Sequence, residues 1–233
     1  MSPPLIVVSY DDTDNDRDAL ALGRLFGDAG ADLALAYVRH TPELDRERAL
    51  AEERQARALL DRGAAAIDRP DIARHVVLNA STGEGLRELA VREQAAMVVF
   101  GSDYRTAAGS VRPGASAQRL LSGGPSAVAL APARFHDAPR PFHRIGALAE
   151  GVDLASVETA EALAAATGGE VVDARDGSLD LLVIGSRPEA ELGRVMLSAV
   201  TDYVIDLSRC AVLVVPRGAP VRLSPRVHAA AQS

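Results

Sequence analysis

Two stretches of the sequence combine residue types that suit the binding of a phosphorylated ligand. Asp11 and Asp12 follow one apolar run, and a Gly-Ser-Asp-Tyr stretch at residues 101–104 follows another. Glycine lets backbone amides come close to an anion, and Gly114 precedes a helix that we expect to begin near Ala115 and to direct free N–H groups toward a phosphate. The same residues also suit an ordinary turn and helix start, so the local pattern leaves both interpretations open.

Other kinds of chemistry lack the residues that they require. All 25 basic residues are arginine, so phosphate loops and Schiff bases that depend on lysine are excluded. The five histidines show no i, i+4 pair, there is one cysteine, and no serine stands in a Gly-x-Ser-x-Gly elbow. We therefore assign no catalytic residue and no metal site.

Composition and charge narrow the classes of partner. The 233 residues are 48% hydrophobic and 24% charged, which is typical of a folded globular protein. The net charge of −7 and an aromatic content of 3% argue against nucleic acid and an anionic membrane surface as partners. A single cysteine, Cys210, and the absence of a leader-like or membrane-spanning stretch lead us to expect a cytoplasmic protein.

Strand-like and helix-like stretches alternate along the first part of the chain. Continuous aliphatic runs predict strands, and amphipathic or Ala/Glu/Arg-rich stretches predict helices between them. Strands that are apolar throughout and alternate with helices are typical of a parallel sheet covered on both faces. The predicted strands are 5–8, 33–38, 75–78, 97–100 and 127–130, and the predicted helices are 19–26, 43–68, 85–94 and 115–121.

An internal repeat is present. Residues 97–132 align with residues 181–216 without a gap, and nine of the 36 pairs are identical. A second, weaker match sets Asp11 over Glu150 and leaves the second copy short of about one helix, one strand and another helix. The short link that remains before residue 181 leaves open whether one strand runs differently or the sheet is abbreviated, because a parallel crossover normally needs a helix.

The stretches 8–12, 98–102 and 127–132 resemble a universal stress protein domain, and the whole chain resembles a tandem of two. The resemblance implies a flavodoxin-like, adenine nucleotide alpha hydrolase-like (Rossmann-like) α/β fold with five parallel strands ordered 3-2-1-4-5. It also implies pairing through the last strands, either within the chain as a pseudo-dimer or as a homodimer. We expect a first domain at residues 1–135 and, after a proline-rich linker, a truncated second domain at residues 142–217. We expect residues 218–233 to form a disordered tail.

Nucleotide-binding members of that family carry Gly, two residues, Gly, nine residues, Gly and then Ser or Thr. Gly101 and Gly114 match the first and third glycines, while Tyr104 and Ala115 replace the second glycine and the hydroxyl residue, with Ser116 one place later. Asp11 matches the family's acidic residue after the first strand, and Val38 matches the family's second-strand residue that lies near the adenine. The resemblance thus implies as nucleotide-binding residues Tyr10, Asp11, Val38, Gly101, Ser102, Gly114, Ala115 and Ser116.

The second copy departs further from the motif. It keeps Gly185 but has Pro188, Ser198 and Ala199 at the other motif positions, and Glu150 stands where the aspartate would be. We do not expect it to bind a nucleotide.

Three functional hypotheses follow. The first is a non-catalytic stress-response module that binds ATP, with Mg²⁺, or another adenine nucleotide in its first copy. The alternative is a family member that binds no nucleotide, needs no cofactor and acts through protein contacts, which the departures at Tyr104 and Ala115 favour. A nucleotide-hydrolysing enzyme ranks last, because the sequence shows no base, metal cluster or phosphate-binding lysine. Tyr104 discriminates the first two, since a side chain that fills the cleft would favour the alternative.

Overall fold

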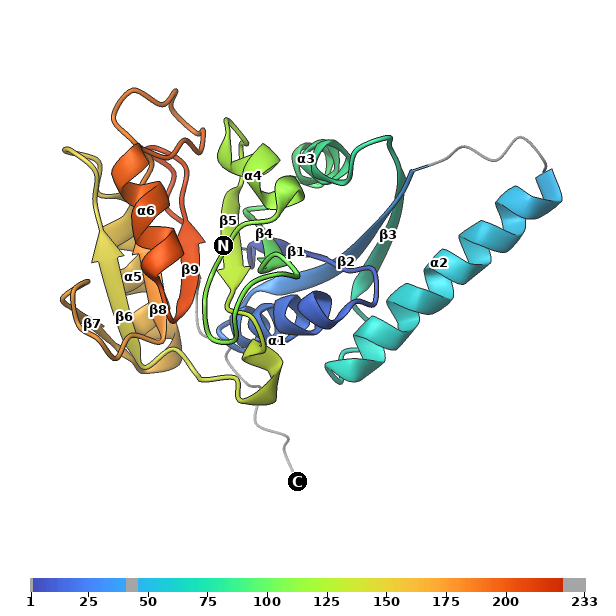
Figure 1. The fold of residues 1–233 in the computed structure, drawn as a ribbon, viewed down its shortest axis with the longest axis horizontal. Coiled ribbons are helices and arrows are strands. Elements are labelled where there is room, and N and C mark those ends of the chain that lie inside the picture. Colours follow the sequence, from blue (N-terminus) through green and yellow to red (C-terminus); the bar gives the residue numbers. More distant parts are fainter. Residues whose placement is uncertain (1, 41–45, 224–233) are drawn as a thin grey trace.

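Aliphatic runs form strands and the amphipathic stretches between them form helices, as their patterns predict. The computed structural model describes residues 2–40 and 46–223 (Figure 1). The elements of the first half are β1 (Leu5–Ser9), α1 (Asp14–Asp28), β2 (Asp32–Arg39), α2 (Arg46–Ala66), β3 (Ala73–Leu78), α3 (Thr82–Arg92), β4 (Met97–Gly101), α4 (Ala115–Leu121) and β5 (Ala127–Ala131).

The second half is shorter, as the repeat predicted. Between β7 and β8 the chain forms neither a helix nor a strand, which confirms the missing helix, strand and helix. The elements of this half are η1 (Phe135–Asp137), β6 (Arg144–Leu148), α5 (Ala155–Thr167), β7 (Glu170–Val172), β8 (Leu181–Ile184), α6 (Ala199–Leu207) and β9 (Ala211–Val214).

Local capping fixes the start of α1 within the acidic run after β1, ahead of the apolar segment 19–26 that the sequence predicts as helical. Thr13 precedes the helix in an extended conformation, and the Asp16 carboxylate accepts hydrogen bonds from the Thr13 N–H at 3.0 Å and from Thr13 Oγ1 at 2.6 Å. This capping box satisfies groups that the helix itself cannot pair. The predicted start of α2 at residue 43 lies outside the described residues.

The nine strands within residues 2–40 and 46–223 form one sheet in the order β3-β2-β1-β4-β5-β9-β8-β6-β7. The first five are parallel in the order 3-2-1-4-5, which confirms the expected α/β class. β5 and β9 are antiparallel, and Ala129 lies opposite Leu213, its own equivalent in the repeat. The two halves therefore pair through their last strands around a local two-fold axis, within one chain.

The link between β7 and β8 crosses over β6. Both strands lie parallel to β6, one on each side, so the chain crosses it within residues 173–180. A Cβ atom on Gly146 of β6 would lie 2.8 Å from Leu179 Cδ1 and 3.1 Å from Ala174 Cα. The link therefore lies directly on the strand, and Gly146 provides the room that a side chain would remove. The sheet is abbreviated, which resolves the alternative that the sequence left open.

The sheet separates two apolar layers, because successive strand residues point to opposite faces. One layer lies under α1, α2 and α5, where the Phe26 and Phe142 rings approach to 5.0 Å between centroids across the two halves. The other lies under α3, α4 and α6. Both layers run through β5 and β9, so the halves share one core. Within the described residues, no helix has the length and apolar character needed to cross a membrane.

The first residues after the second half are packed, in contrast to the expected disordered tail. Val221 and Leu223 are buried in the layer under α5, and the Val221 N–H donates to Thr159 Oγ1 at 3.0 Å. Burial of two aliphatic side chains offsets the entropy of ordering this short segment. The remainder of the expected tail, residues 224–233, lies outside the described residues.

Candidate functional site

A cavity of about 740 Å³ opens at the carboxyl ends of β1 and β4. These two strands are neighbours at the point where the strand order reverses, and ligands of open α/β sheets bind in such a place. The cavity brings together six of the eight residues that the sequence singled out: Asp11, Gly101, Ser102, Gly114, Ala115 and Ser116.

Tyr10 and Val38 lie elsewhere. The Tyr10 ring is buried in the layer under α2, where a Cβ atom on Gly63 would lie 2.7 Å from its Cε1 atom. Val38 is buried on the opposite face, beside Gly85 at the start of α3. Both side chains therefore support the elements around the cavity and are absent from its lining.

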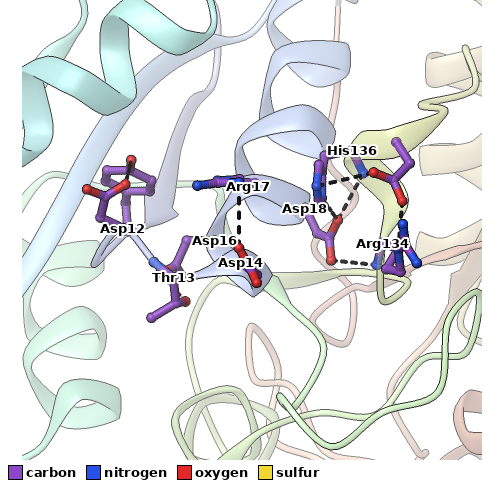
Figure 2. A network of polar contacts seen from close by, with 10 residues as sticks. Asp12, Thr13, Asp14, Asp16, Arg17, Asp18, Arg134 and His136 are labelled. Atoms are coloured by element: carbon purple, nitrogen blue, oxygen red, sulfur yellow. Dashed lines mark hydrogen bonds and ion pairs between the residues drawn. The ribbon is translucent and has the colours of Figure 1, made fainter.

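The two acids after β1 have different surroundings. Asp11 lines the cavity. Asp12, labelled in Figure 2, has a left-handed conformation at φ 69°. It accepts hydrogen bonds from the Tyr10 hydroxyl at 2.8 Å and from Arg62 Nη2 of α2 at 2.8 Å. Hydrogen bonds from Arg62 and Tyr10 lower the pKa of Asp12, and burial followed by the bond to Asp12 raises the pKa of Tyr10. Asp12 thus holds the loop to α2, and of these two acids Asp11 is the one that lines the cavity.

Asp16 lies between the helix cap and the cavity. Its Oδ2 atom accepts the Asp11 N–H at 3.0 Å in addition to the two groups of Thr13. Burial, with a smaller contribution from the neighbouring Asp11, raises the pKa of Asp16 to about 7. Asp16 is therefore partly protonated at neutral pH, which reduces the negative charge on this side of the cavity.

Asp18 fixes the linker between the halves to α1 (Figure 2). Its buried carboxylate accepts the backbone N–H groups of Arg134 at 2.8 Å and His136 at 2.9 Å, and Oδ1 lies 2.6 Å from His136 Nδ1. Arg134 has a left-handed conformation at φ 64°, and its side chain bonds to Asp137 at 2.7 Å. These residues form one wall of the cavity, and sequence reasoning missed them because Asp18 and the linker lie more than a hundred residues apart.

The two matched glycines have different reasons to be glycine. A Cβ atom on Gly101 would lie 2.0 Å from the carbonyl oxygen of Asn15, so packing of α1 against β4 alone requires glycine. A Cβ atom on Gly114 would come no closer than 4.0 Å to its nearest neighbour, Asp103 Oδ2. No packing contact therefore explains Gly114, whose missing side chain leaves backbone exposed to the cavity.

Ser102 has a structural partner that the second half repeats. Its hydroxyl donates to the carbonyl oxygen of Ala131 at 2.7 Å and accepts the Arg112 N–H at 3.3 Å. At the equivalent place the Ser186 hydroxyl donates to Val215 at 2.8 Å and accepts the Met196 N–H at 3.2 Å. Each serine ties the loop after a central strand to the end of the next strand, so both bonds hold the loop.

Tyr104 leaves the cavity open. Its side chain is 69% exposed and lies at the rim, with the Arg105 guanidinium 4.9 Å from the ring centroid. Ser116, on the first turn of α4, lines the cavity and forms no hydrogen bond through its hydroxyl with any described residue. The motif would place a hydroxyl residue at position 115, which is alanine. The hydroxyl of Ser116, one position later, is therefore available instead.

The equivalent place in the second half is closed by a side-chain bond. Ser198 Oγ, at the position of Gly114, donates to Glu150 Oε1, at the position of Asp11, over 2.6 Å. Ser198 also caps α6 by accepting the Thr201 N–H at 3.2 Å. This bond therefore joins the two side chains whose first-half equivalents, Gly114 and Asp11, both line the open cavity.

The lining of the first-half cavity is acidic. Among residues 2–40 and 46–223, no three histidine, cysteine, aspartate or glutamate side chains are grouped closely enough to hold a metal ion by themselves. The basic groups on the lining, Arg134 and His136, are paired with Asp137 and Asp18. The acids on the lining are Asp11, Asp14, Asp16, Asp18 and Asp103.

The chain was compared with protein-family profiles and with solved structures. The universal stress protein family profile matches residues 5–132 and 170–216. A universal stress protein from Archaeoglobus fulgidus DSM 4304 is 17% identical and superposes with a TM-score of 0.67 over 92% of this chain and 98% of that chain. A functionally unknown protein from Pseudomonas aeruginosa PAO1 is 14% identical, with a TM-score of 0.59 over 93% of each chain.

These two likenesses show the fold alone, and comparison with curated proteins finds no match. The family profile, however, covers most of the chain and both halves of the repeat. The chain therefore belongs to the universal stress protein family.

Proposed function

We propose that this protein is a non-catalytic binding module that takes an adenine nucleotide, such as ATP, in the cavity of its first half. The observation that carries the proposal is Gly114, where backbone is exposed to the cavity and no packing contact accounts for the glycine. Close approach of backbone to a phosphate is a reason for glycine at such a place. The available Ser116 hydroxyl supports the same interpretation, and Tyr104 at the rim leaves room for a ligand.

The acidic lining indicates that the nucleotide enters with a divalent cation. Asp11, Asp16 and Asp103 would repel bare phosphates, because like charges at close range in a partly desolvated site raise the free energy of the complex. Magnesium accepts oxygen ligands from carboxylates and phosphates together. Asp11 and Asp103 are the residues that would face the cation, and partial protonation of Asp16 lowers the repulsion further.

Calorimetric titration of the full chain with ATP and Mg²⁺ tests the proposal. Before the titration, a separate sample of the purified protein is denatured and the supernatant is chromatographed. This control establishes that no nucleotide was carried through purification. We expect saturable heat in Mg²⁺ and at least tenfold weaker binding in EDTA. The Glu150→Gln variant is the control, because Glu150 is the second-half equivalent of Asp11 and lies outside the first-half cavity. This variant should bind the nucleotide as the unaltered chain does.

Absence of heat with nucleotide-free protein would contradict the proposal. Function would then rest on protein contacts, the alternative that the altered motif leaves open.

A further inference from the structure

The second half lacks the helix that stands beside the last helix of the first half. In the first half α3 packs against α4 (Figure 1). Glu84 Oε2 lies 3.2 Å from Arg119 Nε, and a Cβ atom on Gly83 would lie 2.8 Å from Arg119 Cβ. In the second half residues 173–180 join β7 to β8 without a helix. The matching side of α6 therefore has no helix of the second half beside it.

A groove of about 600 Å³ occupies this place. Val204 and Leu207 of α6 form one side, Ala174 and Leu179 of the crossing link form the other, and Leu182 of β8 also lines it. The groove is therefore lined by aliphatic side chains from three separate segments, and it lies where the repeat would place a helix.

The outer face of α6 is apolar although it is exposed. Val200, Tyr203 and Leu207 are 68%, 64% and 58% exposed, and their spacing places them along one side of the helix beside the groove. The equivalents of Val200 and Tyr203 in α4 are Ser116 and Arg119, which are polar. An apolar stripe at a surface that contacts only water has no stabilising role, whereas such a stripe is typical of an interaction surface.

The groove has an unusual charge for this acidic chain. Arg140, Arg175 and Arg209 line it and are exposed, and none of them has a carboxylate partner among the described residues. Asp176, the one acid on the lining, already bonds to Arg144 at 2.5 Å. Arg209 Nη1 donates to the Ser110 hydroxyl, a neutral group. Within a chain of net charge −7, the groove thus presents positive charge that no carboxylate of the described residues pairs with.

We propose that this groove docks an amphipathic helix of a partner protein, with apolar residues against α6 and acidic residues facing Arg140, Arg175 and Arg209. A helix is the occupant because α3 fills the matching place in the first half, and helices dock into apolar grooves through residues spaced at i, i+3 or i+4, and i+7. The acidic flank follows from charge complementarity. The groove is separate from the first-half cavity, so this inference is independent of nucleotide binding.

Fluorescence anisotropy with two designed peptides tests the proposal on the full chain. The first is a labelled, stapled helix of about 15 residues with leucine at i, i+4, i+7 and i+11, glutamate at the flanking positions and alanine elsewhere. The second is its twin with lysine in place of every glutamate. We expect the glutamate peptide to bind at least tenfold more tightly than the lysine twin, and this preference to be lost in Arg175→Glu/Arg209→Glu.

Two single variants locate the binding surface. Leu207→Ser should weaken binding of the glutamate peptide at least fivefold, whereas Leu192→Ser, a change at a more exposed leucine outside the groove, should not. Failure of both peptides to bind, or equal binding of both that the arginine variants do not alter, would overturn the proposal. Self-association of the chain in sedimentation, abolished by Leu207→Ser, would also overturn it, since the occupant would then be a second copy.

Discussion

Ser198 donates a hydrogen bond of 2.6 Å to Glu150, and this bond spans the place in the second half that corresponds to the open cavity of the first. The two residues stand where the first half has Gly114 and Asp11, so the repeat itself compares an open and a closed version of one site. The difference between the versions is made by side chains on an otherwise shared backbone, because the loop bonds of Ser102 and Ser186 are the same in both.

Substitution of the two matched glycines should show which of them is required for packing of the fold. Gly101→Ala would place Cβ 2.0 Å from a backbone oxygen, and we expect it to lower the free energy of unfolding by about 3 kcal/mol or more. Gly114→Ser has open space and a helix-capping residue at an N-cap position, so we expect a change within about 0.5 kcal/mol. Urea denaturation of both variants measures this, and equal destabilisation would contradict the assignment.

Ser102→Ala should act on stability and spare ligand binding. The change leaves the buried Ala131 carbonyl and the Arg112 N–H without the serine hydroxyl, and we expect a loss of about 1–3 kcal/mol. Ser186→Ala, its counterpart in the closed half, should cost a similar amount. Chemical denaturation and calorimetry check both effects. A Ser102→Ala chain of unaltered stability that no longer bound nucleotide would assign the hydroxyl to the ligand instead.

Asp16 should make the fold less stable as pH rises from about 4 to 7. Its pKa is raised to about 7 by burial, so in this range the folded chain keeps a proton that the unfolded chain releases. The stability present at low pH is lost progressively until the folded group also ionises, and above that pH the contribution is constant. Denaturation at pH 5 and pH 8 should show a smaller loss for Asp16→Asn than for the unaltered chain. Identical losses would contradict the raised pKa.

Asp18→Ala should be a costly substitution in α1, because the Asp18 side chain is buried. It would remove the acceptor of two backbone N–H groups and of His136 Nδ1, and we expect a loss of about 2–4 kcal/mol. Asp14→Ala is the matched control, since Asp14 makes one exposed ion pair of 3.6 Å with Arg17 and should change stability by about 0.5 kcal/mol or less. Thermal denaturation distinguishes the two, and an equal effect would show that Asp18 does not anchor η1.

Local patterns predicted most of the elements, and the repeat predicted the shortened second half. Period and composition were sufficient for β1, β4 and β5, because these strands are apolar and largely buried on both faces. The acidic run at residues 11–14 indicated a helix cap, and Thr13 within it caps α1, whereas apolar spacing predicted only the segment 19–26 of that helix. The crossing link over Gly146 was left open because a glycine in a strand does not reveal which segment approaches it.

The site was predicted in part, for a physical reason. The loops that line the cavity follow from the topology of parallel strands, whose carboxyl ends meet at one edge. Which of Asp11 and Asp12 faces the cavity depends on Arg62, fifty residues away, and on a left-handed conformation at Asp12. The wall formed by Asp18 and His136 depends on a contact between α1 and the linker, which spacing along the sequence does not encode.

The central claim is that the first-half cavity binds the nucleotide, and its most direct test places the side-chain types of Glu150 and Ser198 in that cavity. Calorimetric titration with ATP and Mg²⁺ is carried out on the double variant Asp11→Glu/Gly114→Ser, which places the Glu150 and Ser198 side-chain types at the equivalent positions. If the first-half cavity is the nucleotide site, the double variant should retain the stability of the unaltered chain and lose nucleotide binding at least tenfold. Unchanged binding by the folded double variant would place the nucleotide elsewhere and contradict the account.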